Sequence, residues 1–218
     1  MTHPDVADPR LSGLHVLADD DPHWKHDPLE QALAACAGGA AVVQLRAKHA
    51  SDRDALAWAE AVREATRRAG ALFLVNDRFD LALACGADGV HLGQGDLPPE
   101  RIPGSLRARL LVGRSTHDEA QLARACREPV DYVAFGPVFA TGSKAGAEPA
   151  RGVERLAAAV ARAAPRPVVA IGGVEHTRVA ALRAAGAAGF AVISAVAGAD
   201  APEQAVRALV RAWAEAAA

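Results

Sequence analysis

The chain has 218 residues, a hydrophobic content of 51% and a formal net charge of -2. This length can bury the core of one domain, and the hydrophobic content excludes a disordered chain. The near-neutral charge argues against nucleic-acid or acidic-membrane partners, and no apolar run reaches the ~20 residues of a membrane helix. Residues 1–10 lack the basic start and apolar core of a secretory signal, so we expect a cytoplasmic protein.

Short apolar runs alternate with longer, Ala-rich amphipathic stretches along the chain. Such runs are expected for strands of a parallel sheet that is buried on both faces. The predicted strands are 14–18, 41–46, 72–76, 89–92, 110–115, 132–136, 168–172 and 189–194. The predicted helices are 28–37, 52–69, 78–85, 98–108, 118–127, 152–164, 175–185 and 202–217.

Eight strand–helix units over this length favour a closed (β/α)8 barrel, the TIM barrel, rather than an open doubly wound sheet. Ser51 and residues 116–118 are typical of helix starts. We expect a single domain over residues 1–218, with residues 1–12 as a flexible N-terminal segment.

Rare residue types give two further indications. Three cysteines are an odd number and far apart in the chain, so we expect them to be reduced rather than paired or metal-bound. Lysine is also rare, because Lys25, Lys48 and Lys144 are the only lysines among 24 basic residues, and Asn76 is the only asparagine. This scarcity suggests that those positions need those residue types.

In a TIM barrel the chemistry lies in the loops that follow the strands. The second predicted strand ends with Gln44, Arg46 and Lys48. Alternation along a strand places these three residues on one side of the sheet. An amide, a planar guanidinium fork and an ammonium group can together bind an anion. The alternative is a solvated rim with ordinary ion pairs.

Two carboxylates follow neighbouring strands. Asp77 follows the third predicted strand and Asp96 follows the fourth. Together they could hold Mg2+, which prefers a few carboxylates, water molecules and substrate phosphate oxygens. Each could equally cap the helix that follows it, the commoner role of an aspartate after a strand. Spacing alone does not choose between these two interpretations.

The fifth and sixth predicted strands lead into polar loops. Ser115 can cap a helix or bind phosphate, and His117 can be an acid–base group or a structural histidine. Residues 136–146 form a loop that contains hydroxyl groups, glycines and Lys144, and such a loop can close over a substrate. Lys144 could also form a Schiff base, although such lysines usually lie within a dry strand.

Small residues follow the last two predicted strands. Gly172 and Gly173 end the seventh, and residues 192–195 end the eighth. Exposed backbone N–H groups in these two loops form the recurring phosphate site of TIM barrels, and glycine lets the backbone approach a phosphate closely. Tight turns that need positive φ would explain the glycines as well. The occurrence in both loops favours phosphate.

Motifs at successive strand ends resemble those of the thiamine phosphate synthase family, in the family's order and over nearly the whole chain. They are Gln-Leu-Arg-Ala-Lys (44–48), Val-Asn-Asp (75–77), Gly-Val-His-Leu-Gly-Gln-Gly-Asp (89–96), Ser-Thr-His (115–117), Phe-Gly-Pro-Val-Phe-Ala-Thr-Gly-Ser-Lys (135–144), Ala-Ile-Gly-Gly-Val (170–174) and Val-Ile-Ser-Ala (192–195). The resemblance implies a transferase of thiamine biosynthesis. It would join hydroxymethylpyrimidine diphosphate to hydroxyethylthiazole phosphate, releasing diphosphate.

The resemblance also implies a role for each site residue. The pyrimidine diphosphate would be held by Gln44, Arg46, Lys48 and Asn76, with Ser115 and Lys144 on its diphosphate. Asp77 and Asp96 would bind Mg2+ as the cofactor. The thiazole phosphate would be received by Thr141, Gly142, Ser143, Gly173, Ile193 and Ser194. Partners are then small phosphorylated molecules, and the exposed helices of a small barrel are compatible with a homodimer.

Some segments depart from the family's pattern. The sixth loop is Ala-Thr-Gly-Ser-Lys instead of the usual Pro-Thr-x-Thr-Lys, and Gly95 stands where an acidic residue is common. Residues 14–20 and 113–115 resemble a sister family, the thiazole tautomerases, in which His117 would be the proton-transfer residue. That branch tends to lose the metal carboxylates, so the presence of both here favours the synthase. A non-catalytic barrel that binds a phosphorylated ligand is a further alternative.

Overall fold

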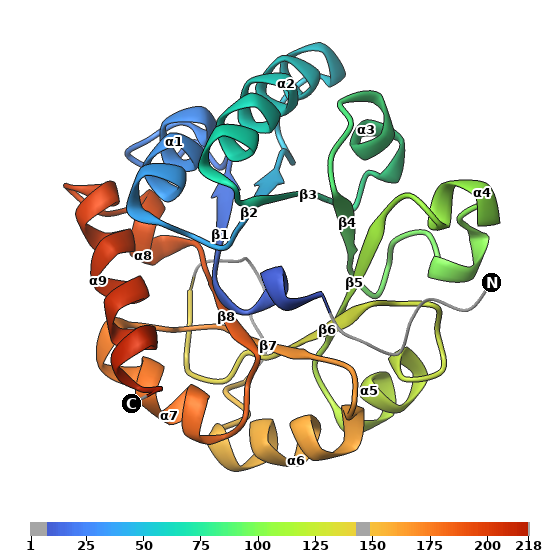
Figure 1. The fold of residues 1–218 in the computed structure, drawn as a ribbon, viewed down its shortest axis with the longest axis vertical. Coiled ribbons are helices and arrows are strands. Elements are labelled where there is room, and N and C mark those ends of the chain that lie inside the picture. The colour runs from blue at the N-terminus through green and yellow to red at the C-terminus, as the bar shows by residue number, and fades with distance from the viewer. Residues whose placement is uncertain (1–7, 143–148, 218) are drawn as a thin grey trace.

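The structure is a computed structural model that describes residues 8–142 and 149–217. Its parallel strands close into a barrel in chain order, with the helices around the outside (Figure 1). The strands are β1 (Gly13–Asp19), β2 (Val42–Arg46), β3 (Leu72–Asn76), β4 (Gly89–Leu92), β5 (Leu111–Thr116), β6 (Tyr132–Phe135), β7 (Val168–Ile171) and β8 (Gly189–Val192). The predicted (β/α)8 fold is confirmed, and strand ends differ from the prediction by at most two residues.

The helices agree with the prediction less closely. Described α-helices are α1 (Pro28–Gly38), α2 (Asp52–Ala69), α3 (Phe79–Ala84), α4 (Gly104–Arg107), α5 (Glu119–Ala125), α6 (Val153–Ala163), α7 (Val179–Ala184), α8 (Ser194–Ala197) and α9 (Pro202–Glu215), and 3-10 turns are η1 (Pro9–Leu11), η2 (Pro99–Arg101) and η3 (His176–Arg178). The predicted helix 98–108 is broken into η2 and α4, because Pro103 cannot continue a helix from the preceding residues. Helix α8 was not predicted, since we extended the last strand to residue 194.

Helix ends follow the sequence signals. The Ser51 side chain accepts a hydrogen bond from the Asp54 amide at the start of α2, and Asp118 accepts one from the Gln121 amide at the start of α5. Gly70 ends α2 with φ of 72°, a left-handed conformation that glycine adopts without strain. These local signals explain why α2 has the predicted bounds.

Alternation along the strands divides the buried residues into two layers. One face of each strand packs against the surrounding helices and carries the larger apolar cluster. The other face points into the barrel, where the apolar cluster includes Leu17, Leu74, Tyr132 and Val169. The interior also holds buried polar side chains, among them His15, Gln44 and His91. The barrel is therefore filled by side chains below the loops that follow the strands.

The N-terminal end of the barrel is closed by η1, which lies across the middle of the strand ring in Figure 1. Leu11 is 1% exposed and packs in the interior cluster. His15 Nε2 donates a hydrogen bond to the Leu11 carbonyl at 2.8 Å. We predicted a flexible segment over residues 1–12, and residues 9–11 differ from that prediction because Leu11 buries its side chain. Residues 1–7 lie outside the described residues.

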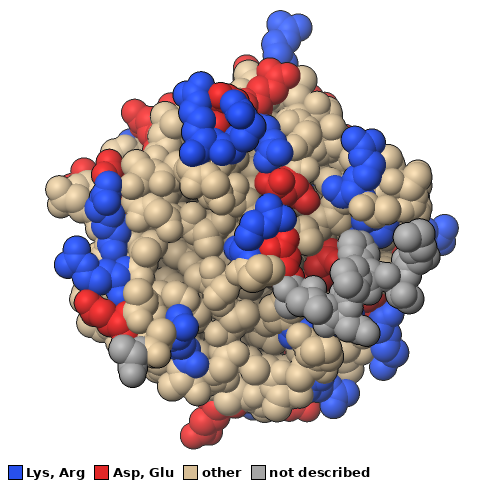
Figure 2. All heavy atoms as spheres, viewed as in Figure 1, with Lys and Arg blue, Asp and Glu red and all other residues tan. Residues whose placement is uncertain are grey.

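Charged side chains of both signs are interspersed on the face drawn in Figure 2. Many of them pair locally, as Glu64 does with Arg67 and Arg68 on α2. The cysteines Cys36, Cys85 and Cys126 are half-buried and carry no disulfide. Within residues 8–142 and 149–217, no helix is both long and apolar enough to span a bilayer.

Candidate active site

A cavity of about 420 Å³ opens at the carboxyl ends of the strands. Most of the predicted site residues line it, namely Arg46, Lys48, Asn76, Asp77, Asp96, Ser115, His117, Thr141, Gly173, Ile193 and Ser194. Gln44 and Gly142 are not among the lining residues, and Ser143 and Lys144 lie outside the described residues. The fold thus brings together side chains that are up to about 150 positions apart in the sequence (Arg46 to Ser194).

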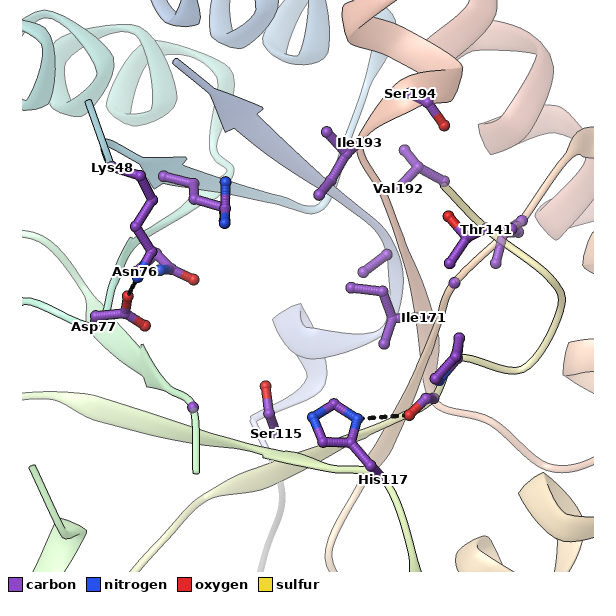
Figure 3. Close-up of a pocket in the computed structure, with 18 of the residues that line it drawn as sticks. Lys48, Asn76, Asp77, Ser115, His117, Thr141, Ile171, Val192, Ile193 and Ser194 are labelled. Atoms are coloured by element: carbon purple, nitrogen blue, oxygen red, sulfur yellow. Dashed lines mark hydrogen bonds and ion pairs between the residues drawn. The ribbon is translucent and has the colours of Figure 1, made fainter. Parts of the chain in front are cut away.

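The cavity has distinct sides, which Figure 3 shows. Lys48, Asn76 and Asp77 lie on one side, and Thr141 and Ser194 lie across from them. The side chains of Ser115 and His117 lie between these two groups. Charged groups and hydroxyl or backbone groups therefore face each other across one space.

The side of the cavity that carries Arg46 and Lys48, here called the charged side, is supported by two carboxylates at the end of β1. Arg46 donates to Asp19 at 2.5 Å, and Asp19 is 1% exposed. The Asp20 carboxylate accepts hydrogen bonds from the backbone amides of Lys48, His49 and Ala50, each at 2.8 Å. Sequence reasoning missed these two aspartates as supports. Their position at the end of the strand next to β2 was the signal that could have identified them.

Gln44 lies two residues before Arg46 on β2, so both side chains are on the same face of the strand, and Gln44 is 3% exposed. Its side-chain oxygen Oε1 makes no hydrogen bond to any described residue. A buried amide oxygen without a donor is costly, so such an atom is typical of a site that receives a donor from a ligand. Gln44 can thus contribute to binding from beneath the cavity.

The two predicted metal carboxylates lie together. Asp77 adopts φ of 64°, the left-handed region, and its carboxylate pairs with Lys48. It does not cap α3, whose N-cap is Arg78 without a side-chain bond. Asp96 accepts a hydrogen bond from the Gly93 amide at 2.6 Å within its own loop, and η2 begins after Pro98. Neither aspartate caps a following helix, so the commoner interpretation is wrong at both positions.

The pKa values of this carboxylate pair move in opposite directions. Burial raises the pKa of Asp77, and the adjacent Asp96 carboxylate raises it further, against the effect of Lys48. Burial also acts to raise the pKa of Asp96, but hydrogen bonds from Asp77 and the Gly93 amide outweigh it and lower that pKa. Two carboxylates this close share a proton or need a shared cation. Among the described residues, no group of three or more His, Cys, Asp or Glu side chains is placed to hold a metal ion.

Arg114 supports the loop that carries Asp96 rather than the cavity. It donates to the Gly93 carbonyl at 2.5 Å and pairs with Glu128 at 3.1 Å, and its side chain is 7% exposed. Arg114 lies between Gly113 and Ser115 on β5, so alternation turns it away from the barrel interior. Within residues 113–115, which resemble the tautomerases, Arg114 therefore has a structural contact outside the cavity.

Ser115 and His117 present polar atoms to the cavity. The Ser115 hydroxyl lies 2.9 Å from His91 Nε2. His117 Nδ1 lies 2.7 Å from the Gly136 carbonyl, which can only accept, so Nδ1 carries the hydrogen (Figure 3). The His117 amide donates to Gln121 at 2.8 Å. Both side chains are therefore fixed before any ligand binds.

The opposite side of the cavity is shaped by glycine. Gly173 adopts φ of 62°, and a Cβ atom there would overlap the Ala140 carbonyl. The close approach lets the segment after β6 pair with the end of β7, through Val138 to Ile171 at 2.8 Å and Phe139 to Gly172 at 3.0 Å. Thr141 is thereby held beside β7. Ile193 leaves the strand conformation and Ser194 begins α8, so both predicted phosphate loops border the cavity.

Comparison with known proteins decides the family. Residues 14–196 match the family model described as thiamine monophosphate synthase. The chain belongs to this family. It is 48% identical over 185 residues to the thiamine-phosphate synthase of Methanoculleus marisnigri, covering 85% of this chain and 87% of that protein. It is 50% identical over 202 residues to that of Anaeromyxobacter dehalogenans, covering 90% and 85%.

Solved structures agree with the family assignment. A thiamine phosphate pyrophosphorylase from Pyrococcus furiosus matches with a TM-score of 0.85 and 33% identity, covering 96% of this chain and 99% of that one. A 3-hexulose-6-phosphate synthase matches with a TM-score of 0.66 at 21% identity, which shows a shared fold alone. The predicted resemblance to the thiamine phosphate synthase family is confirmed.

Proposed function

We propose that this member of the thiamine monophosphate synthase family is a transferase that joins hydroxymethylpyrimidine diphosphate to hydroxyethylthiazole phosphate. The products are thiamine phosphate and diphosphate. The observation that carries the proposal is the two-sided cavity, with cations and a carboxylate pair on one side and glycine loops on the other. One side suits a diphosphate that leaves and the other suits a phosphate that stays.

The pyrimidine diphosphate would lie on the charged side. Arg46, Lys48 and Ser115 would donate hydrogen bonds to its diphosphate, together with Lys144. The Gln44 oxygen, which has no donor among the described residues, would accept a hydrogen bond from the pyrimidine amino group, and the Asn76 amide would donate to a ring nitrogen. In this arrangement the buried amide oxygen of Gln44 gains a donor that the described residues do not supply.

Asp77 and Asp96 would hold Mg2+, and their donor chemistry fits this hard cation because both offer carboxylate oxygens beside a phosphate site. When bound, the ion would supply positive charge to the diphosphate oxygens. Lys48 would then be shared between Asp77 and the substrate, because it already contacts Asp77.

The reaction needs charge stabilisation rather than a protein nucleophile. The bond between the pyrimidine methylene carbon and the diphosphate oxygen breaks, and its electron pair leaves with the diphosphate. Arg46, Lys48 and Ser115 stabilise the negative charge that develops there. The aminopyrimidine stabilises the carbon cation, which the thiazole nitrogen then attacks with its lone pair. Thr141, Gly142, Ser143, Gly173, Ile193 and Ser194 would hold the thiazole phosphate during this step.

Purified protein should form thiamine phosphate and release diphosphate in equal amounts when both substrates and Mg2+ are supplied. Product formation should cease in EDTA and return with excess Mg2+. Asp77→Asn and Asp96→Asn should each lower kcat/KM by about 100-fold or more, since charge stabilisation of the leaving group is the main contribution. Unchanged turnover in both variants would remove the metal assignment.

The same measurements separate the alternatives. A thiazole tautomerase would keep its activity in EDTA and lose it in His117→Ala. A non-catalytic ligand-binding barrel would bind the substrates and release no diphosphate with any metal. Borohydride trapping of a carbonyl substrate on Lys144 would indicate Schiff-base chemistry instead.

A further inference from the structure

Three polar side chains form a connected line from the barrel interior to the cavity. The Tyr132 hydroxyl lies 2.8 Å from His91 Nδ1, and His91 Nε2 lies 2.9 Å from the Ser115 hydroxyl. Tyr132 is 1% exposed and His91 is 8% exposed, whereas Ser115 lines the cavity. The proposed reaction uses Ser115 but gives no role to Tyr132 or His91.

The local backbone makes room for this line. In the barrel register Gly113 on β5 stands between His91 on β4 and Tyr132 on β6. A Cβ atom at Gly113 would overlap the ring and hydroxyl of Tyr132. The missing side chain therefore lets the Tyr132 hydroxyl cross β5 and reach His91, two strands away.

The line has a direction, which starts at Tyr132. Burial raises the pKa of Tyr132, so its hydroxyl keeps its hydrogen. Among the described residues, His91 is the hydrogen-bond partner of that hydroxyl. The nearby His15 ring meets Tyr132 at a steep angle, and His15 Nε2 donates to the Leu11 carbonyl. If Tyr132 accepted from His91, its own hydrogen would remain buried without an acceptor, which is unfavourable.

The remaining hydrogens follow from this start. With Tyr132 donating to Nδ1, His91 carries its hydrogen on Nε2 and donates it to the Ser115 oxygen. The Ser115 hydroxyl then directs its own hydrogen away from His91 and into the cavity. With the opposite order, Ser115 would donate to His91 and could only accept from a ligand. Diphosphate oxygens accept and do not donate, so only the first order suits them.

We propose that Tyr132 and His91 are positioning residues that orient the Ser115 hydroxyl as a hydrogen-bond donor to bound diphosphate. The proposal rests on the proposed function in so far as diphosphate is the ligand at Ser115. Neither Tyr132 nor His91 is among the residues that line the cavity, so both act through Ser115.

The first test reads the hydrogen positions directly in the protein without substrate. Long-range 1H–15N spectra of protein labelled with 15N-histidine distinguish the two neutral imidazole tautomers, and loss of one set of signals in His91→Gln assigns His91. We expect the hydrogen on Nε2 at neutral pH in the wild-type protein, and a mixture of tautomers in Tyr132→Phe. A hydrogen on Nδ1 in the wild-type protein would overturn the proposal.

The second test is a double-mutant cycle of Tyr132→Phe and Ser115→Ala. Tyr132→Phe keeps the ring and removes the hydroxyl, and it should lower kcat about tenfold, the size of effect expected for one misdirected hydrogen bond to an anion. In the Ser115→Ala background the same change should alter kcat by less than about twofold. Equal factors in both backgrounds would mean that Tyr132 acts on the fold and not through Ser115.

A matched control and a second measurement complete the experiment. Thr116 adjoins Ser115 on β5, and its buried hydroxyl donates to the Ala134 carbonyl at 2.8 Å. Thr116→Val also removes a buried hydroxyl and should leave kcat within about twofold. The cycle is repeated on the Kd of inorganic diphosphate in Mg2+. If the wild-type protein formed no thiamine phosphate, the proposed function would fail, whereas the tautomer and this Kd cycle would still decide the positioning role.

Discussion

Asp20 stabilises the backbone that carries Lys48, and Asp20→Ala removes that support. Its carboxylate accepts three backbone hydrogen bonds, from residues 48, 49 and 50, each at 2.8 Å. A hydrogen bond to a charged acceptor contributes about 1.5–3 kcal/mol when buried. Asp20 is only half-buried and water can replace it, so we take about 0.5–1 kcal/mol for each bond, or roughly 1.5–3 kcal/mol in total.

This loss should be visible in stability and in catalysis. For a chain of this length about 1 kcal/mol corresponds to about 2–4 °C, so Tm should fall by about 3–12 °C. Because Lys48 would no longer be held beside the proposed diphosphate site, kcat/KM should fall about 10- to 100-fold. Thermal unfolding and steady-state assays measure both. Asp200→Ala serves as the control, since Asp200 is 93% exposed and pairs with Lys25 on the surface. If Asp20→Ala kept Tm within about 1 °C and kcat/KM within about twofold, the supporting role would be refuted.

Three further changes test other parts of the structure. Burial lowers the pKa of His15 to about 4, below its ordinary value of 6.5, so the unfolded state binds more protons between these pH values and stability is lost as pH falls through that range. In urea titrations at pH 7.5 and pH 5, the free energy of unfolding of His15→Gln should fall by about 2 kcal/mol less than that of the wild type. An equal fall in both proteins would contradict the assignment. Gly173→Ala should raise the KM for thiazole phosphate about tenfold or more and the KM for the diphosphate substrate by less, because a side chain there forces the 138–141 segment away from β7. Equal effects on both KM values would argue against binding of the two substrates on separate sides of the cavity. Arg114→Leu should lower the free energy of unfolding in urea by about 3 kcal/mol or more, because it leaves Glu128 buried without its partner. Adding Glu128→Leu should restore part of that free energy. No recovery would show that the contact of Arg114 with Gly93 dominates.

The sequence was sufficient for the strands but less so for the helices. Strands such as 72–76 and 89–92 are buried on both faces, so most of their residues are apolar and the runs are easy to recognise in the sequence. The short helices α4, α7 and α8 were harder to predict. They have only four to six residues, so tertiary packing rather than periodicity determines where they begin.

The candidate site divides in the same way. The sequence by itself determined the barrel, its order of strands and the family, because each strand is followed by its own motif and the carboxyl ends of parallel strands meet at one end of the barrel. It left open whether Asp77 and Asp96 cap helices or face each other, and it gave no role to Asp20, Arg114 or Tyr132. Those answers depend on contacts between residues far apart in the chain, such as Arg114 with Gly93, Asp20 with the 48–50 amides and Tyr132 with His91, which are 21 to 41 positions apart. Only the tertiary structure decided them, because closure of the barrel brings these residues within hydrogen-bond distance and no local pattern in the sequence records that approach.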